Sequence, residues 1–149
     1  MAPDPTSLGR DRTALAGDPR FFRRAGPFSL AAVVDAAGVE APPRRLMLHR
    51  VAPLQVATGE DVSFCVNNRK LRAALAATRA GAVIVHPDMQ DQVPEGCVAI
   101  VARDPMVAWA RVAALFHPVT PASPGVHPSA IIAGSARIDP SVEVGPMAV

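Results

Sequence analysis

Tyrosine is absent from this 149-residue chain, and only 4% of its residues are aromatic. A hydrophobic core must therefore be built from aliphatic side chains, which the 50% hydrophobic content supplies in sufficient number. No apolar run approaches the roughly 18 residues that cross a bilayer, so we do not expect an integral membrane protein. The first residues also lack the apolar region of a secretory leader, and the expected compartment is the cytoplasm.

Strong charge is missing as well. Fifteen basic and thirteen acidic residues give a net charge of +2, and the basic residues are scattered apart from two Arg pairs. Nucleic-acid binding is not expected, because it favours a dense basic stripe with interleaved aromatics. The two cysteines, Cys65 and Cys97, lie in apolar runs without metal-ligand spacing, which predicts buried reduced thiols and no metal site. None of the four His residues has a carboxylate or a nucleophile at a recognisable spacing, so structural or surface roles are expected for them.

Composition and pattern divide the chain into four parts. Residues 1–17 are rich in Pro, Gly and charge and predict a disordered extension. Residues 18–117 alternate strand and helix patterns, which predicts a small α/β domain. Residues 118–125 are a Pro-rich linker, and residues 126–149 form a repeat.

Within the α/β domain, turn and cap residues separate the predicted elements. Ser29 and Gly38 are suited to begin and end a helix over 30–37, and Asp104 is suited to cap a helix over 106–116. A further helix is expected from Asn68, closed by Gly81. The predicted strands cover residues 46–52, 61–66, 81–87 and 97–102.

The last two dozen residues repeat every six. In register they read VHPSAI, IAGSAR, IDPSVE and VGPMAV. The first position is always aliphatic, and the fifth position is small: Ala130, Ala136, Val142 and Ala148. Such a period is typical of a parallel β-helix, whose coils each use three hexads. The chain therefore holds about one and a third coils, which is fewer than the three or more repeats that stacking needs.

The order of α/β domain, Pro-rich linker and hexads resembles the UDP-3-O-(3-hydroxyacyl)glucosamine N-acyltransferases of lipid A synthesis. The stretches that carry the resemblance are DPRFFRRAGPFSL, VSFCVNNRKLRAALAATRAGAVIV, RDPMVAWARVAALFHP and GVHPSAIIAGSARIDPSVEVGPMAV. The first and third are the more telling, because many acyltransferases share the hexads alone. The resemblance implies a uridine-binding α/β domain followed by the start of a left-handed parallel β-helix, here truncated.

The resemblance also implies a reaction and its partners. The family moves a 3-hydroxyacyl chain from acyl carrier protein to the 2-amine of UDP-3-O-acyl-glucosamine, without a cofactor, and its members are homotrimers. Its general base is a His in the middle of the β-helix, beyond residue 149, so no catalytic residue is expected in this chain. These 149 residues alone are therefore expected to lack acyltransferase activity.

Substrate contacts are implied for Phe64, which matches the side chain that stacks on uracil, and for Asn67 or Asn68, which match a nearby amide. Asn67 follows Phe64 at the family's spacing without a gap. Asn68 follows if one residue is inserted here, and this register is preferred because it aligns its Asn-Arg-Lys run with the family's Asn-Arg-Lys-Tyr. The Tyr itself is replaced by Lys70 or Leu71.

Two other functions stay open. One is a different hexapeptide acetyltransferase that uses acetyl-CoA, against which the domain ahead of the hexads argues. The other is a non-catalytic nucleotide-sugar-binding fragment. Trp109 is expected in the core or against the hexads, with stacking on a ligand as the alternative.

Overall fold

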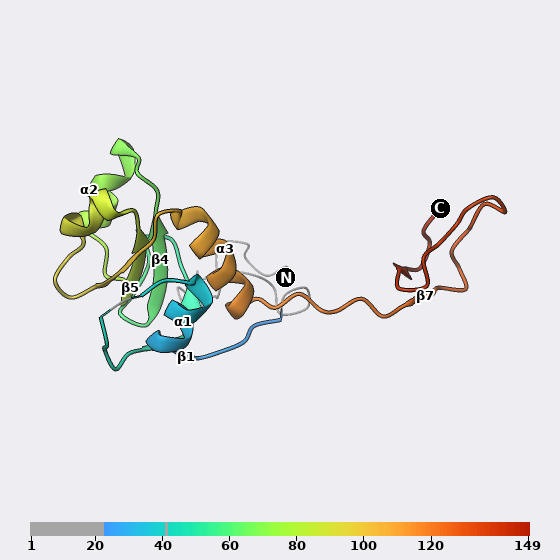
Figure 1. Cartoon of the computed structure of the whole chain (residues 1–149), viewed down its shortest axis with the longest axis horizontal. Coiled ribbons are helices and arrows are strands. Elements are labelled where there is room, and N and C mark those ends of the chain that lie inside the picture. The colour runs from blue at the N-terminus through green and yellow to red at the C-terminus, as the bar shows by residue number, and fades with distance from the viewer. Residues whose placement is uncertain (1–22, 41) are drawn as a thin grey trace, which may run out of the picture. The chain divides into compact units, whose positions relative to one another are not determined.

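The computed structural model describes residues 23–40 and 42–149, and the chain divides into two units. The α/β unit ends at Pro118, and the hexad unit comprises Val119–Val149 (Figure 1). The predicted extension over residues 1–17 falls outside the described residues, and so do residues 18–22, the DPRFF of the DPRFFRR stretch.

The α/β unit is built around a parallel sheet of four strands in the order β3-β4-β5-β6. These strands are Arg50–Val51, Asp61–Cys65, Ala82–Val85 and Val98–Val101. A separate antiparallel pair joins β1 (Phe28–Ser29) to β2 (Met47–Leu48). The predicted α/β class is confirmed for this unit.

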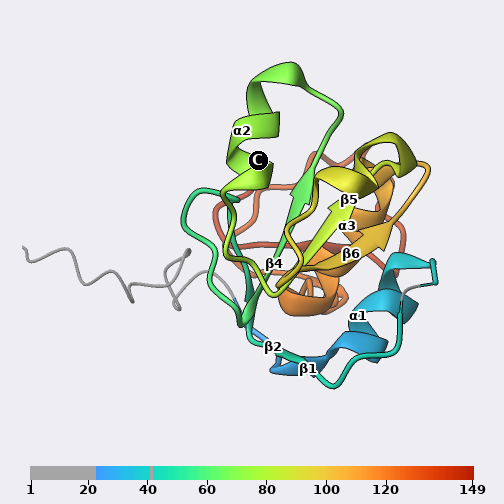
Figure 2. The ribbon, with the colours of Figure 1, turned by 90° about the vertical axis from the view of Figure 1, so that its left-hand side faces the viewer.

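Helices cover both faces of the parallel sheet (Figure 2). The helices α1 (Leu30–Ala37) and α3 (Pro105–Phe116) pack together and contribute to one core cluster. The short helix α2 (Arg72–Ala76) and the 3₁₀ helix η3 (Pro87–Gln92) contribute to a second cluster on the other face. The strand β5 is buried at all four positions because both faces of it are covered.

The predicted caps of two helices are confirmed. The side chain of Ser29 accepts a hydrogen bond from the Ala32 N–H at 3.2 Å, and Gly38 ends α1 in the left-handed conformation with φ of 71°. The carboxylate of Asp104 accepts from two N–H groups of the first turn of α3, both at 3.1 Å. Such caps satisfy donors that a helix end otherwise leaves unpaired.

Two sequence predictions were wrong in detail. The single strand expected over 46–52 is two short strands interrupted at His49, because β2 pairs with β1 while β3 pairs with β4. The helix expected from Asn68 to Gly81 consists of the 3₁₀ helix η2 (Arg69–Leu71) and α2, and it ends at Ala76. After this helix the Thr78 hydroxyl donates a hydrogen bond to the Leu54 carbonyl, which fixes the position of the segment that leads into β5.

The buried cysteine thiols lie in the second core cluster, as the sequence predicts. Burial raises the pKa of Cys97 to about 11, an effect that the nearby Arg44 guanidinium only partly opposes. Burial likewise raises the pKa of Cys65. Both groups therefore stay protonated and behave as small apolar side chains.

The hexad unit carries one parallel strand pair. Strand β7 (Gly125–Val126) pairs with β8 (Glu143–Val144), so that Gly125 lies opposite Glu143 and Val126 opposite Val144. This offset equals three hexads. Further hydrogen bonds follow nearly the same offset, from the Ile131 N–H to the Ala148 carbonyl and from the Met147 N–H to the Ser129 hydroxyl. The six-residue period therefore brings equivalent positions together after three repeats.

No helix in the described ranges is both long and apolar enough to cross a membrane.

Candidate functional site

Phe64, the predicted stacking residue, lies next to a cavity of about 340 Å³ beyond the end of β3. Its ring is half-buried and stacks on the Trp109 indole, with centroids 4.5 Å apart and an angle of 21° between the planes. Phe64 comes from β4 and Trp109 from α3, so the sheet and its covering helix together form one wall. Trp109 was expected in the core or against the hexads, with stacking on a ligand as the alternative. It packs against the core cluster on the face that α1 and α3 cover, and it also lines the cavity.

The remaining walls of this cavity, called here the β3-end pocket, are mainly apolar. They come from the end of β3, the loop after it, β4 and η2: Val51, Ala52, Pro53, Leu54, Gln55, Ser63 and Leu71. An apolar cavity with an aromatic wall and few polar groups is typical of sites that bind flat organic rings. Its position at the carboxyl end of a parallel strand is also where open α/β sheets bind ligands.

Ser63 is the buried polar residue of the pocket. Only 1% of its surface is exposed, and its hydroxyl has no hydrogen-bond partner among the described residues. An unpaired buried hydroxyl costs about 1 to 3 kcal/mol, so this group is suited to accept a partner such as a water molecule, an ion or a ligand. Sequence reasoning missed Ser63, because a single Ser in an apolar strand gives no signal of its own.

Asn67 and Asn68 are exposed on the segment between β4 and η2, and neither lines the β3-end pocket. The side-chain oxygen of Asn68 accepts a hydrogen bond from the Lys70 N–H at 2.9 Å and so caps η2. Its amide NH₂ group and the second lone pair of that oxygen are left for a ligand. Leu71, one of the two positions at which the resemblance expects a Tyr, does line the pocket, whereas Lys70 does not.

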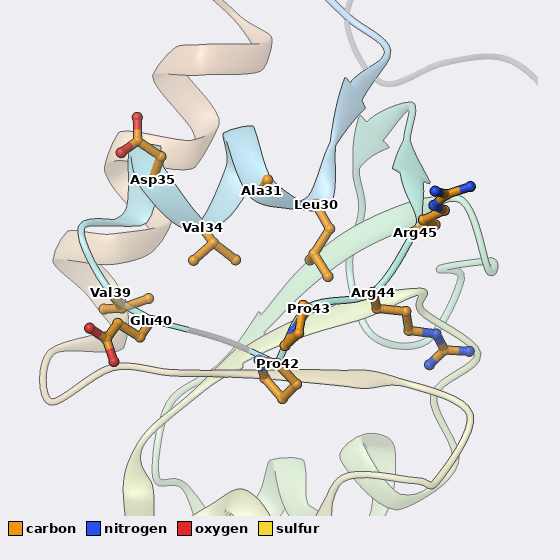
Figure 3. A pocket seen from close by; sticks show the side chains of 10 residues that line it. All are labelled: Leu30, Ala31, Val34, Asp35, Val39, Glu40, Pro42, Pro43, Arg44 and Arg45. Atoms are coloured by element: carbon orange, nitrogen blue, oxygen red, sulfur yellow. The ribbon is translucent and has the colours of Figure 1, made fainter.

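The larger groove of the α/β unit, about 780 Å³, lies beside α1 (Figure 3). Its apolar floor includes Leu30 and Val34, with Asp35 and Glu40 at one end and Arg44 at the other. Because its charges are of both signs and well separated, no single ligand chemistry is favoured there. None of the predicted site residues lies in it.

Groups for nucleophilic catalysis or metal binding are not assembled in the described part of the chain. No three His, Cys, Asp or Glu side chains there could hold a metal ion. His127 Nδ1 lies 2.8 Å from the Ser129 hydroxyl, but both are exposed and the Ser129 N–H also donates to this nitrogen. Because the Ser129 hydroxyl in turn accepts from the Met147 N–H, this pair joins neighbouring segments of the hexad unit and has a structural role.

Sequence comparisons agree with the resemblance. Residues 45–115, from just before β2 almost to the end of α3, match the family described as UDP-3-O-(3-hydroxymyristoyl) glucosamine N-acyltransferase, LpxD. A protein of Granulibacter bethesdensis named UDP-3-O-acylglucosamine N-acyltransferase is 53% identical over 132 residues, which is 88% of this chain. The chain belongs to this acyltransferase family.

Other members of the family share the same region. The protein of the same name from Psychrobacter arcticus is 36% identical over 76% of this chain, and one from an Anaeromyxobacter species (strain K) is 43% identical over 58%. The chain spans only 38%, 33% and 24% of the lengths of the Granulibacter, Psychrobacter and Anaeromyxobacter proteins, respectively. Family membership therefore covers the α/β region well, while most of each relative has no counterpart in this sequence.

Proposed function

We propose that the α/β unit binds the uridine end of a UDP-linked acyl-glucosamine, as part of an N-acyltransferase of lipid A synthesis. The observation that carries this proposal is the β3-end pocket, where Phe64, backed by Trp109, offers an aromatic wall in an otherwise apolar cavity. Stacking on an aromatic side chain contributes about 1 to 3 kcal/mol per base. The family relationship supplies the substrate class, and the pocket supplies a place for its base.

Asn67 and Asn68 are proposed as polar contacts of the nucleotide. The register that aligns Asn68 with the family's amide replaces the Tyr with Leu71, and Leu71 lines the pocket. This position supports the Asn68 register over the one that replaces the Tyr with Lys70. Because Leu has no hydroxyl, we expect weaker nucleotide binding than a chain with Tyr at this position has.

The hexads are proposed as the first coils of a left-handed parallel β-helix. The three-hexad offset between β7 and β8 supports a coil of that length. In the complete reaction the acyl chain passes from acyl carrier protein to the glucosamine 2-amine, in a homotrimer and without a cofactor, and a His outside this sequence serves as general base. We propose no catalytic residue in this chain, and the cytoplasm as its compartment.

Nucleotide binding is tested by titrating the chain with UDP, UDP-N-acetylglucosamine, ADP and coenzyme A while recording the fluorescence of Trp109, which is the chain's one Trp. UDP and its sugar are expected to change the emission, and ADP and coenzyme A are not. Phe64→Ala should weaken UDP binding by about tenfold or more, whereas Phe64→Tyr should preserve it. Val142→Ala, in the hexad unit, is a matched control expected to leave binding unchanged. Preferential binding of coenzyme A would contradict the proposal.

Catalysis is tested separately. The purified chain is expected to form no product from 3-hydroxyacyl carrier protein and UDP-3-O-acyl-glucosamine, because the proposed general base lies outside it. Measurable N-acylated product would show that a residue of these 149 supplies the base.

A further inference from the structure

Only part of the β4 edge that faces β3 is hydrogen-bonded to a neighbouring strand. Strand β3 pairs with Asp61 and Val62, and the last hydrogen bond between them runs from the Ala52 N–H to the Val62 carbonyl at 3.0 Å. On its other side β4 pairs with β5 as far as Cys65. Within the part of the chain that the structure describes, the three residues from Ser63 to Cys65 therefore have a neighbouring strand on one side only.

Of these three, Phe64 directs its main-chain groups to the open side. Successive residues of a strand direct their N–H and C=O groups to opposite edges. The Asp61 carbonyl accepts from Gly81 on the β5 side, and the Val62 carbonyl accepts from Ala52 on the β3 side. Phe64, two residues after Val62, therefore faces the β3 side, where no main-chain hydrogen bond joins it to Ala52 or Pro53.

The β3-end pocket is lined by side chains from both faces of the sheet. Phe64 and Trp109 belong to the core cluster on the face covered by α1 and α3, whereas Leu54 and Leu71 belong to the cluster on the opposite face. All four side chains line this one pocket. A flat ring lying in the plane of the sheet here has aromatic cover on one face and aliphatic cover on the other.

We propose that the ligand's base continues the sheet at this edge. The Phe64 N–H donates to a ring carbonyl, and the Phe64 carbonyl accepts from the adjacent ring N–H, as an added strand would pair with it. A uracil ring carries such a neighbouring C=O and N–H. This inference rests on the proposed uridine binding and goes further, because it assigns the reading of the base to the main chain of Phe64 in addition to its ring.

Amide hydrogen exchange measured by NMR tests this pairing residue by residue. In the free chain the Phe64 amide is expected to exchange at least about tenfold faster than those of Ser63 and Cys65, which face β5. Saturating UDP is expected to slow Phe64 exchange by about tenfold or more. The amides of Ser63 and Cys65 serve as internal controls and should change much less.

A ligand series supplies a second measurement. 3-Methyluridine monophosphate cannot donate from its ring nitrogen, so it should bind about tenfold more weakly than uridine monophosphate. The double variant Asn67→Ala/Asn68→Ala separates main-chain from side-chain recognition. If the Phe64 main chain reads the base, this variant keeps the discrimination against the methylated ring.

The outcomes distinguish the two proposals. UDP binding with unchanged Phe64 exchange, or loss of the discrimination in the Asn variant, overturns the main-chain pairing and leaves the proposed uridine binding intact. Absence of UDP binding overturns the proposed function and this inference together. Slow exchange of the Phe64 amide already in the free chain would also contradict the open edge.

Discussion

The α/β unit and the hexad unit bury their aliphatic side chains to very different extents. In the α/β unit, residues such as Ile84 and Leu75 are completely buried between the sheet and its helices. In the hexad unit no residue reaches that state, and the repeated corner residues Ile132 and Ile138 remain 40% and 37% exposed. A sheet covered on both faces buries its side chains within one unit, whereas a coil of a repeat protein buries them only against neighbouring coils.

A pair of Ile substitutions tests this contrast most strongly. Ile84→Ala removes side-chain atoms from a fully buried site in β5 and should lower the free energy of unfolding by about 3 kcal/mol. Ile132→Ala, at a partly exposed corner of the hexad unit, should change it by less than about 0.5 kcal/mol. Urea unfolding followed by far-ultraviolet circular dichroism measures both. Equal losses would show that the hexads are packed as tightly as the sheet.

The next largest difference in stability is expected between two Asp substitutions, one in each unit. Asp61 is buried, and its carboxylate accepts hydrogen bonds from the Arg50 Nε at 2.6 Å and from the N–H and hydroxyl of Thr58. Burial alone would raise the pKa of Asp61, but the hydrogen bonds from Arg50 and Thr58 outweigh it and hold the pKa below its ordinary value of 3.8. Asp61→Asn should cost about 2 to 3 kcal/mol, less than for a fully buried pair because Arg50 is 26% exposed.

The exposed Asp139 of the hexad unit is the matched control. It accepts hydrogen bonds from the hydroxyl and N–H of Ser141, which lower its pKa, yet Asp139→Asn should change the unfolding midpoint only slightly because solvent screens this exposed group. Because the folded-state pKa of Asp61 is depressed, its stabilisation is complete above the ordinary carboxyl pKa and is lost as the pH falls through the folded-state value. The wild type should therefore lose more stability than Asp61→Asn when denaturation is repeated below about pH 4. A parallel loss in both chains would contradict the assigned role of this carboxylate.

The smallest effect is expected from two Ser substitutions, and it should have opposite signs in the two units. Ser63→Ala removes a buried hydroxyl that no described residue bonds and should stabilise the ligand-free chain by about 1 kcal/mol. Ser141→Ala removes a hydroxyl that donates to Asp139 at 2.6 Å, so a slight destabilisation is expected. Thermal unfolding without ligand compares the two. A loss of stability in Ser63→Ala would indicate that its hydroxyl has a partner in solution.

Local signals in the sequence predicted much of this structure. Ser29, Gly38 and Asp104 marked helix ends because their side-chain or backbone chemistry satisfies groups that a helix leaves unpaired. The six-residue period predicted which hexad positions come together, since β7 and β8 pair at that period taken three times. The stretches shared with the acyltransferases identified the family, which the comparisons then showed independently.

What the sequence alone determined is therefore the class of the α/β unit, its helix caps, the hexad spacing, the family and Phe64 as a residue of interest. Only the tertiary structure decided that Phe64 stacks on Trp109, that β3 ends where a pocket begins, and that no described residue bonds the buried hydroxyl of Ser63. Caps and repeats depend on residues close in the chain or at a fixed period. The pocket depends on the register of β3 against β4 and on the packing of α3 over the sheet, and these join residues whose separation follows no pattern in the sequence.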